Sequence, residues 1–117
     1  MEKRGAKYHR GRLGEALREE IETIVEGELG DPRIGLVNVS SVELAEDSRS
    51  ARVMVVVENE NDAERTMEGL SAAVGYIRHE VADRLHLRRA PELVFVLDRS
   101  EKYQSRVDEL LKRTRKK

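Results

Sequence analysis

The sequence of 117 residues contains no cysteine and no tryptophan, and it has only one phenylalanine and three tyrosines. Without cysteine the chain can form no disulfide, no thiolate zinc site and no cysteine nucleophile. Aromatic residues make up 3% of the chain, so its core must be aliphatic. A protein that binds single-stranded nucleic acid by stacking has several aromatic residues on its platform, and this chain has too few.

Long apolar runs are absent as well. No window approaches the roughly 18 apolar residues of a membrane span, and the basic N-terminus is not followed by the apolar segment of a secretory signal. We therefore expect a cytoplasmic protein with no membrane partner.

Catalytic and metal-binding patterns are also missing. The histidines are His9, His79 and His86. The last two are seven positions apart, about 10 Å on an unbroken helix, so they cannot bind one metal ion together. The sequence has no glycine-rich phosphate loop, nucleophile elbow or metal-ligand spacing. We expect no enzymatic activity and no cofactor.

Charge is unevenly distributed, although the net charge is only -1. Residues 1–14 carry a net charge of +4 and residues 99–117 a net charge of +5, whereas residues 19–68 carry -10. This distribution predicts a bipolar molecule whose basic ends are candidate contacts for nucleic acid.

The spacing of apolar residues predicts a first helix from His9 or Arg10 to Leu29. Gly30 in a left-handed conformation, followed by Pro32, would end it.

Two strands follow, at about residues 36–44 and 50–58, and the turn-like residues 46–49 would join them as an antiparallel hairpin. The apolar residues of the first strand change parity near Ser40-Ser41. Either a bulge or a change of exposure would explain this change.

A second helical region begins near Asn61 or Asp62 and ends near Leu87, with Gly75 interrupting its apolar face. A glycine inside a helix costs about 1 kcal/mol relative to alanine, so it needs a reason such as a kink or a close backbone approach. We expect a bend at Gly75, with two helices meeting at Ala73-Val74-Gly75.

A third strand at residues 92–97 and a last helix at about 100–113 complete the chain. The helix pair before the third strand is long enough for a right-handed crossover between parallel strands. We predict one α+β domain at residues 9–112, with a three-stranded mixed sheet, a C-terminal helix, and basic tails at residues 1–8 and 113–117.

Several ordered segments of the second half resemble the bacterial ribosome-binding factor A family. They are Gly75-Tyr76-Ile77-Arg78, Leu87-Arg88, Pro91-Glu92-Leu93, Phe95 and Asp98. The resemblance implies a KH-like fold of type II, α-β-β-α-kink-α-β. Tyr76 stands where many family members have phenylalanine, a conservative difference.

The resemblance also implies a function. Family members are non-enzymatic assembly factors that bind the small (30S) ribosomal subunit through 16S rRNA. They assist late maturation and processing of the 5′ end of 16S rRNA, and they support growth in the cold. By resemblance we expect a monomer that works beside other assembly factors, including GTPases.

Three groups of residues are candidate RNA contacts. The family has Ala-x-Gly where KH domains have Gly-x-x-Gly, which assigns Ala73 and Gly75. The basic helix and its exit contribute Arg78, Arg84, Arg88 and Arg89, although some of these could pair with Glu80 or Asp83 instead. The basic termini contribute Lys3, Arg4, Lys7, Arg10, Arg12, Lys112, Arg113 and Arg115.

An alternative function comes from the first helix. Glu15, Glu19, Glu22 and Glu26 recur every three or four residues and would form one stripe. Such a stripe is typical of a solvated face, but it would also suit a protein-interaction module that docks a basic partner.

Overall fold

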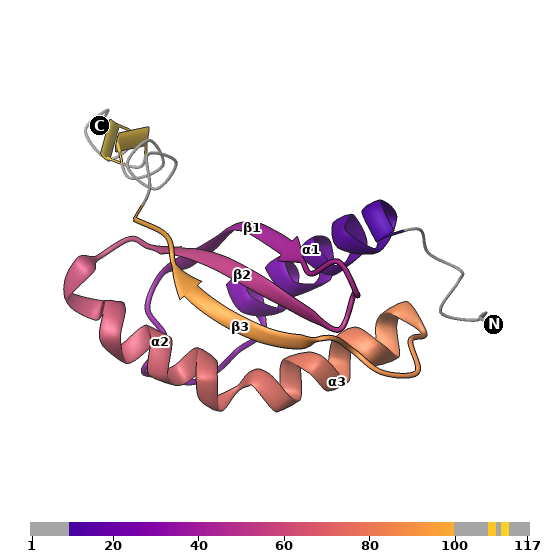
Figure 1. Ribbon diagram of the computed structural model, residues 1–117. Helices are drawn as coiled ribbons and strands as arrows, with labels where there is room; N and C mark the ends of the chain where they lie inside the picture. The colour runs from indigo at the N-terminus through magenta and orange to yellow at the C-terminus, as the bar shows by residue number, and fades with distance from the viewer. Residues whose placement is uncertain (1–9, 100–107, 110, 113–117) are drawn as a thin grey trace.

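The computed structural model describes residues 10–99 together with residues 108, 109, 111 and 112 (Figure 1). Its elements in chain order are α1 (Arg10–Gly27), β1 (Val37–Leu44), β2 (Ser50–Val57), the short 3-10 helix η2 (Glu60–Asp62), α2 (Ala63–Ala72), α3 (Val74–Leu85) and β3 (Glu92–Leu97). The sheet order is β1-β2-β3, with β1 antiparallel to β2 and β3 parallel to it. The predicted α+β fold with a three-stranded mixed sheet is confirmed, and it is consistent with a KH-like arrangement.

Helices α1, α2 and α3 bury an aliphatic core against one face of the sheet. Along β2, the residues Ala51, Val53, Val55 and Val57 are at most 2% exposed. They form one cluster with apolar residues of the helices, which include Leu17, Ile21, Ile24, Leu70, Ile77 and Val81. Burial of this apolar surface is the main favourable contribution to folding.

A β-bulge explains the change of parity in β1. The pairing register with β2 shifts between Val39 and Ser41, so Ser40 is an extra residue on β1. The shift returns Val42 to the face that packs on the core. The Ser40 hydroxyl donates a hydrogen bond of 2.8 Å to Oδ2 of Asp98, a buried carboxyl group just beyond β3. The bulge therefore also ties β1 to the end of the third strand.

The end of α1 differs from the prediction. The helix stops at Gly27, and Gly30 is not left-handed, since none of the described glycines has a positive φ. The chain turns instead at Asp31, whose carboxylate accepts a hydrogen bond of 2.9 Å from the backbone N–H of Arg33. The Arg33 guanidinium also donates to this carboxylate, and together these bonds hold the pKa of Asp31 below its ordinary value. A side chain, rather than a glycine conformation, shapes this turn.

The two helices meet within the predicted junction Ala73-Val74-Gly75, but the break lies at Ala73, two residues before the predicted bend at Gly75. Ala73 has φ -90° and ψ -1°, and α3 begins at Val74, which makes Gly75 the second residue of α3. Apart from its chain neighbours and the backbone of its own helix, a Cβ atom on Gly75 would meet no atom within 4 Å. The close approach is at Gly69 instead, where a Cβ atom would lie 2.6 Å from Cγ1 of Ile34.

The second half of the chain otherwise follows the prediction closely. Helix α3 ends at Leu85 rather than Leu87, because His86 takes the left-handed conformation with φ 57°. Strand β3 has the predicted bounds. Residues 108, 109, 111 and 112 of the predicted last helix are helical. The rest of that helix and both predicted tails lie outside the described residues.

The described helices are all too short or too polar to cross a membrane.

Candidate nucleic-acid interface

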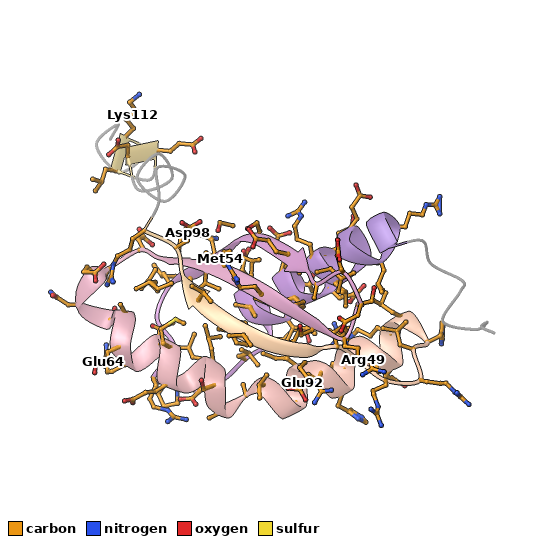
Figure 2. The ribbon with its side chains drawn as sticks, in the orientation of Figure 1. Arg49, Met54, Glu64, Glu92, Asp98 and Lys112 are labelled. Atoms are coloured by element: carbon orange, nitrogen blue, oxygen red, sulfur yellow. The ribbon has the colours of Figure 1, made fainter. Side chains whose placement is uncertain are left out.

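One end of the molecule brings together the start of α1, the turn between β1 and β2, and the loop between α3 and β3 (Figure 1). Figure 2 shows Arg49 and Glu92 at this end, and Glu64 and Asp98 at the other. Since β2 and β3 are parallel, the residues that precede the two strands meet at the same end of the sheet. We call it the hairpin end.

A groove of about 520 Å³ lies at the hairpin end, between the β1–β2 turn and the α3–β3 loop. Its lining residues are Ser48, Arg49, Arg78, Arg89, Ala90, Pro91 and Glu92. Three of these carry a positive charge and one carries a negative charge, so the walls are net positive. We call it the arginine groove.

Arg78 holds one wall of the arginine groove in place. Its Nε donates a hydrogen bond of 2.9 Å to the carbonyl oxygen of Pro91, and its Nη2 donates one of 2.8 Å to that of Ala90. These bonds use two of the five N–H donors of a guanidinium group. The predicted RNA contact Arg78 therefore has a structural task as well, since it fixes the loop that carries Arg89 to α3.

The opposite wall is the β1–β2 turn, which presents Arg49. The Asp47 carboxylate accepts a hydrogen bond of 3.0 Å from the backbone N–H of Arg49, and Ser48 is left-handed with φ 61°. The N–H of Glu92 donates to the carbonyl oxygen of Arg49 at 2.9 Å, which joins the two walls.

Arg49 was missed in the sequence-based prediction, because an arginine in a turn has no distinguishing pattern. The missing signal was the register between the two parallel strands. Ser50 pairs with Glu92, so Arg49 must lie beside the residue that precedes β3. A turn that looks isolated in sequence thus becomes part of a basic site once the sheet is paired.

Arg88 and Arg89 are both exposed, and in the part of the chain that the structure describes their side chains have no hydrogen-bond or ion-pair partner. Arg12 is also exposed, near the start of α1. The side chain of Arg10 lies outside the described part of the chain. These exposed guanidinium groups can exchange water for phosphate oxygens without breaking a contact inside the protein.

Arg84 has a different environment from Arg88 and Arg89. Its guanidinium lies 2.6 Å from Glu28, 3.0 Å from Glu80 and 3.6 Å from Glu20. The hydrogen bonds with Glu28 and then Glu80 raise the pKa of Arg84 above its ordinary value, and Arg84 in turn lowers the pKa of Glu28. Arg84 thus clamps α3 to α1, and three carboxylates oppose its charge.

The backbone N–H at the centre of the helix break is already bonded inside the protein. The N–H of Ala73 already donates to the carbonyl oxygens of Gly69 and Leu70, at 3.0 and 3.1 Å. Gly75 and Tyr76 are exposed in the first turn of α3, with Tyr76 48% exposed. A strand of nucleic acid can approach the backbone of α3 closely at Gly75, because no side chain stands there.

The predicted basic termini cannot all be placed. Lys3, Arg4, Lys7, Arg113 and Arg115 lie outside the described residues. Lys112 is exposed, and Figure 2 shows it beyond Asp98, at the opposite end of the sheet from Arg49. It is therefore not part of the arginine groove.

Some of the glutamates in the acidic stripe of α1 are bonded to other groups within the molecule. Oε2 of Glu26 accepts a hydrogen bond of 2.9 Å from the backbone N–H of Val39, and Glu22 pairs with Arg18 at 3.2 Å. Glu15 and Glu19 are exposed. Two of the four glutamates thus have a partner within the molecule.

No three His, Asp or Glu side chains converge as a metal site within the described residues.

The family model described as Ribosome-binding factor A matches residues 9–111, nearly the whole chain. The chain belongs to the ribosome-binding factor A family. The ribosome-binding factor A of Koribacter versatilis is 63% identical over 118 residues, covering 100% of this chain and 96% of that protein. The one from Caldanaerobacter subterraneus is 39% identical over 115 residues, covering 97% and 94%.

Solved structures of ribosome-binding factor A share the fold. The crystal structure of the Thermus thermophilus protein matches with a TM-score of 0.68 and 29% identity, covering 80% of this chain and 100% of that chain. A homology model of the Thermus thermophilus factor, fitted into a cryo-EM map of a complex with the 30S subunit, matches with a TM-score of 0.54 and 32% identity, covering 78% and 92%.

Proposed function

We propose that this chain is a non-enzymatic ribosome assembly factor that binds the small (30S) ribosomal subunit through 16S rRNA. Membership of the ribosome-binding factor A family supports the proposal, as does the 30S complex of the Thermus thermophilus relative. The observation that carries it is the set of exposed arginines at the hairpin end, where Arg49, Arg88 and Arg89 project from two neighbouring loops.

In this proposal the hairpin end faces rRNA, and the opposite end, which carries the acidic segment 58–64, faces away. Contacts between arginine and phosphate supply affinity and orientation without reading the base sequence. The scarcity of aromatic residues fits recognition of folded RNA by its shape rather than of an unpaired strand by stacking.

The factor would act through binding energy alone. It favours one arrangement of the immature rRNA because it binds that arrangement more tightly than the competing ones. The finer role that we propose is support of late maturation, including processing of the 5′ end of 16S rRNA, with importance for growth in the cold. We propose that it acts as a monomer, beside other assembly factors that include GTPases.

Co-sedimentation with small subunits, large subunits and assembled ribosomes at two salt concentrations tests this function. Selective, salt-sensitive binding to small subunits is the expected result. The double variant Arg88→Ala/Arg89→Ala should bind more weakly and lower the slope of log affinity against log salt by about two, one for each lost phosphate contact.

The variant Arg18→Ala is the matched control, since Arg18 is exposed on α1 and pairs locally with Glu22. It should leave the salt slope unchanged. Equal binding to every particle would contradict a specific role in small-subunit assembly. Binding that survives Arg88→Ala/Arg89→Ala but is lost in Glu15→Gln/Glu19→Gln would point to a basic protein partner on α1 instead.

A further inference from the structure

The arginine groove gathers charge from three separate parts of the chain. Arg49 comes from the β1–β2 turn, Arg78 from α3, and Arg89 from the loop before β3. The guanidinium group presents its donors in a planar fork that fits the oxygens of a phosphate.

The groove is also preorganised. The two hydrogen bonds from Arg78 fix the loop at Ala90 and Pro91, and the backbone bond from Glu92 to Arg49 fixes the loop to the turn. Ala90 is only 5% exposed, which anchors the loop in the core. A ligand therefore meets walls that are already in place, and little conformational entropy is lost on binding.

The lining residues point to the sugar–phosphate backbone rather than to bases. The groove contains no aromatic side chain on which a base could stack. It offers guanidinium donors and the Ser48 hydroxyl, which suit phosphate oxygens and ribose hydroxyls.

Glu92 is the exception in this positive environment. It is exposed at the first position of β3 and lines the same groove as the three arginines. Its negative charge opposes a phosphate group at any position in the groove. Such a residue lowers the affinity for phosphate without changing the shape of the groove.

We propose that the arginine groove binds the phosphate backbone of a folded RNA strand, with Arg49, Arg78 and Arg89 as phosphate contacts and Glu92 as the residue that limits affinity. The proposal rests on the proposed function for its RNA. It adds Arg49 and Glu92 to the residues predicted from sequence, and it joins them with Arg78 and Arg89 in one groove.

The test compares matched substitutions inside and outside the groove. Arg49→Ala should weaken binding about tenfold, as expected for a lost charged hydrogen bond, and should lower the salt slope by about one. Glu92→Gln should tighten binding about threefold, the effect of removing one like charge at roughly 7 Å in water. Arg52 and Glu43, an exposed ion pair on the open sheet face at 3.7 Å, supply the controls Arg52→Ala and Glu43→Gln.

Binding of each variant is measured on purified small subunits and on protein-free 16S rRNA, after thermal unfolding has confirmed that it is folded. Opposite effects of Arg49→Ala and Glu92→Gln on both targets, with unchanged controls, would support the groove as an RNA site. Unchanged binding in both groove variants would overturn the proposal that the groove binds RNA. Effects on small subunits but not on protein-free rRNA would overturn RNA as its occupant.

The same measurements separate the groove from the proposed function. If the wild-type protein binds small subunits selectively and the groove variants behave like their controls, the function stands and the groove proposal falls. If the variants change binding to protein-free rRNA but the wild-type protein does not select small subunits, the groove stands and the assembly function falls.

Discussion

Gly69 and Gly75 lie six positions apart around the same helix break, but their surroundings differ. A side chain on Gly69 would collide with Ile34, which packs against the core. A side chain on Gly75 would point into open space. Packing against Ile34 explains why residue 69 is a glycine. No packing contact among the described residues explains why residue 75 is a glycine.

Replacement of Gly75 by alanine should therefore stabilise the protein by about 0.5–1 kcal/mol, the difference in helix propensity between the two residues. Urea-induced unfolding measures this change. The control Gly69→Ala gains the same propensity but must displace Ile34, and overpacking of this kind costs about 1–3 kcal/mol. We expect the control to be destabilised.

The same Gly75→Ala variant tests the helix break as an RNA contact. If rRNA approaches the backbone of α3 at Gly75, the more stable variant should bind small subunits less tightly. Binding equal to that of the wild type would show that Gly75 is not part of the interface with rRNA.

Sequence reasoning at the scale of single residues could name the arginines but could not separate their tasks. Arg78, Arg84, Arg88 and Arg89 occur in one basic stretch. Arg84 faces Glu20 of α1 and Glu28 just after α1, which are more than fifty positions away in sequence. Only the packing of α1 on α3 distinguishes a clamp from an exposed contact.

At the scale of elements, the clamp between α1 and α3 makes stability depend on pH. The hydrogen bond from Arg84 lowers the pKa of Glu28 below its ordinary value of 4.5. The contribution of this ion pair to stability is therefore present above about pH 4.5, and it is lost as the pH falls through the lowered pKa of the folded state.

Glu28→Gln should accordingly be less stable than the wild type at neutral pH, and the difference should shrink in acid. Unfolding by urea at a series of pH values measures it. Glu15→Gln, on α1 and outside the clamp, should show no comparable pH-dependent difference. A difference for Glu28→Gln that stayed constant down to strongly acidic pH would show that the ion pair is not its cause.

The elements themselves were largely readable from sequence. The alternation of side chains between two faces predicted β2, and Pro91 followed by an apolar run predicted β3. The prediction of a left-handed conformation at Gly30 was wrong, because the turn after α1 is stabilised by the Asp31 side chain instead of by a glycine. A bulge was one of two open explanations for β1, and only the pairing register located it at Ser40.

At the scale of the whole molecule, the two ends differ in charge as well as in structure. The segment 58–64, which includes η2, has four acidic residues and no basic one, and it lies at the end opposite the arginine groove (Figure 1). At this end Glu60 pairs with Arg99 and Asp62 pairs with Arg65, whereas the side chains of Arg49 and Arg89 have no ion-pair partner among the described residues. The unpaired arginines should therefore turn the hairpin end toward a polyanion.

The absence of cysteine allows a direct test of this orientation. Single variants Glu46→Cys, in the β1–β2 turn, and Glu64→Cys, at the opposite end, can each carry a tethered iron chelate that cleaves nearby rRNA. We expect cleavage of 16S rRNA in the small-subunit complex from position 46 and little from position 64. Strong cleavage from position 64 alone would reverse the proposed orientation.

The parallel pairing of β2 with β3 also has a consequence for synthesis of the chain. The hairpin of β1 and β2 needs only local contacts, but the second wall of the arginine groove comes from residues 29 to 43 positions after Arg49. Contacts of such long sequence separation form late in folding. If the arginine groove binds rRNA as proposed, a nascent chain should gain its full affinity for rRNA only after β3 has left the ribosome and paired with β2.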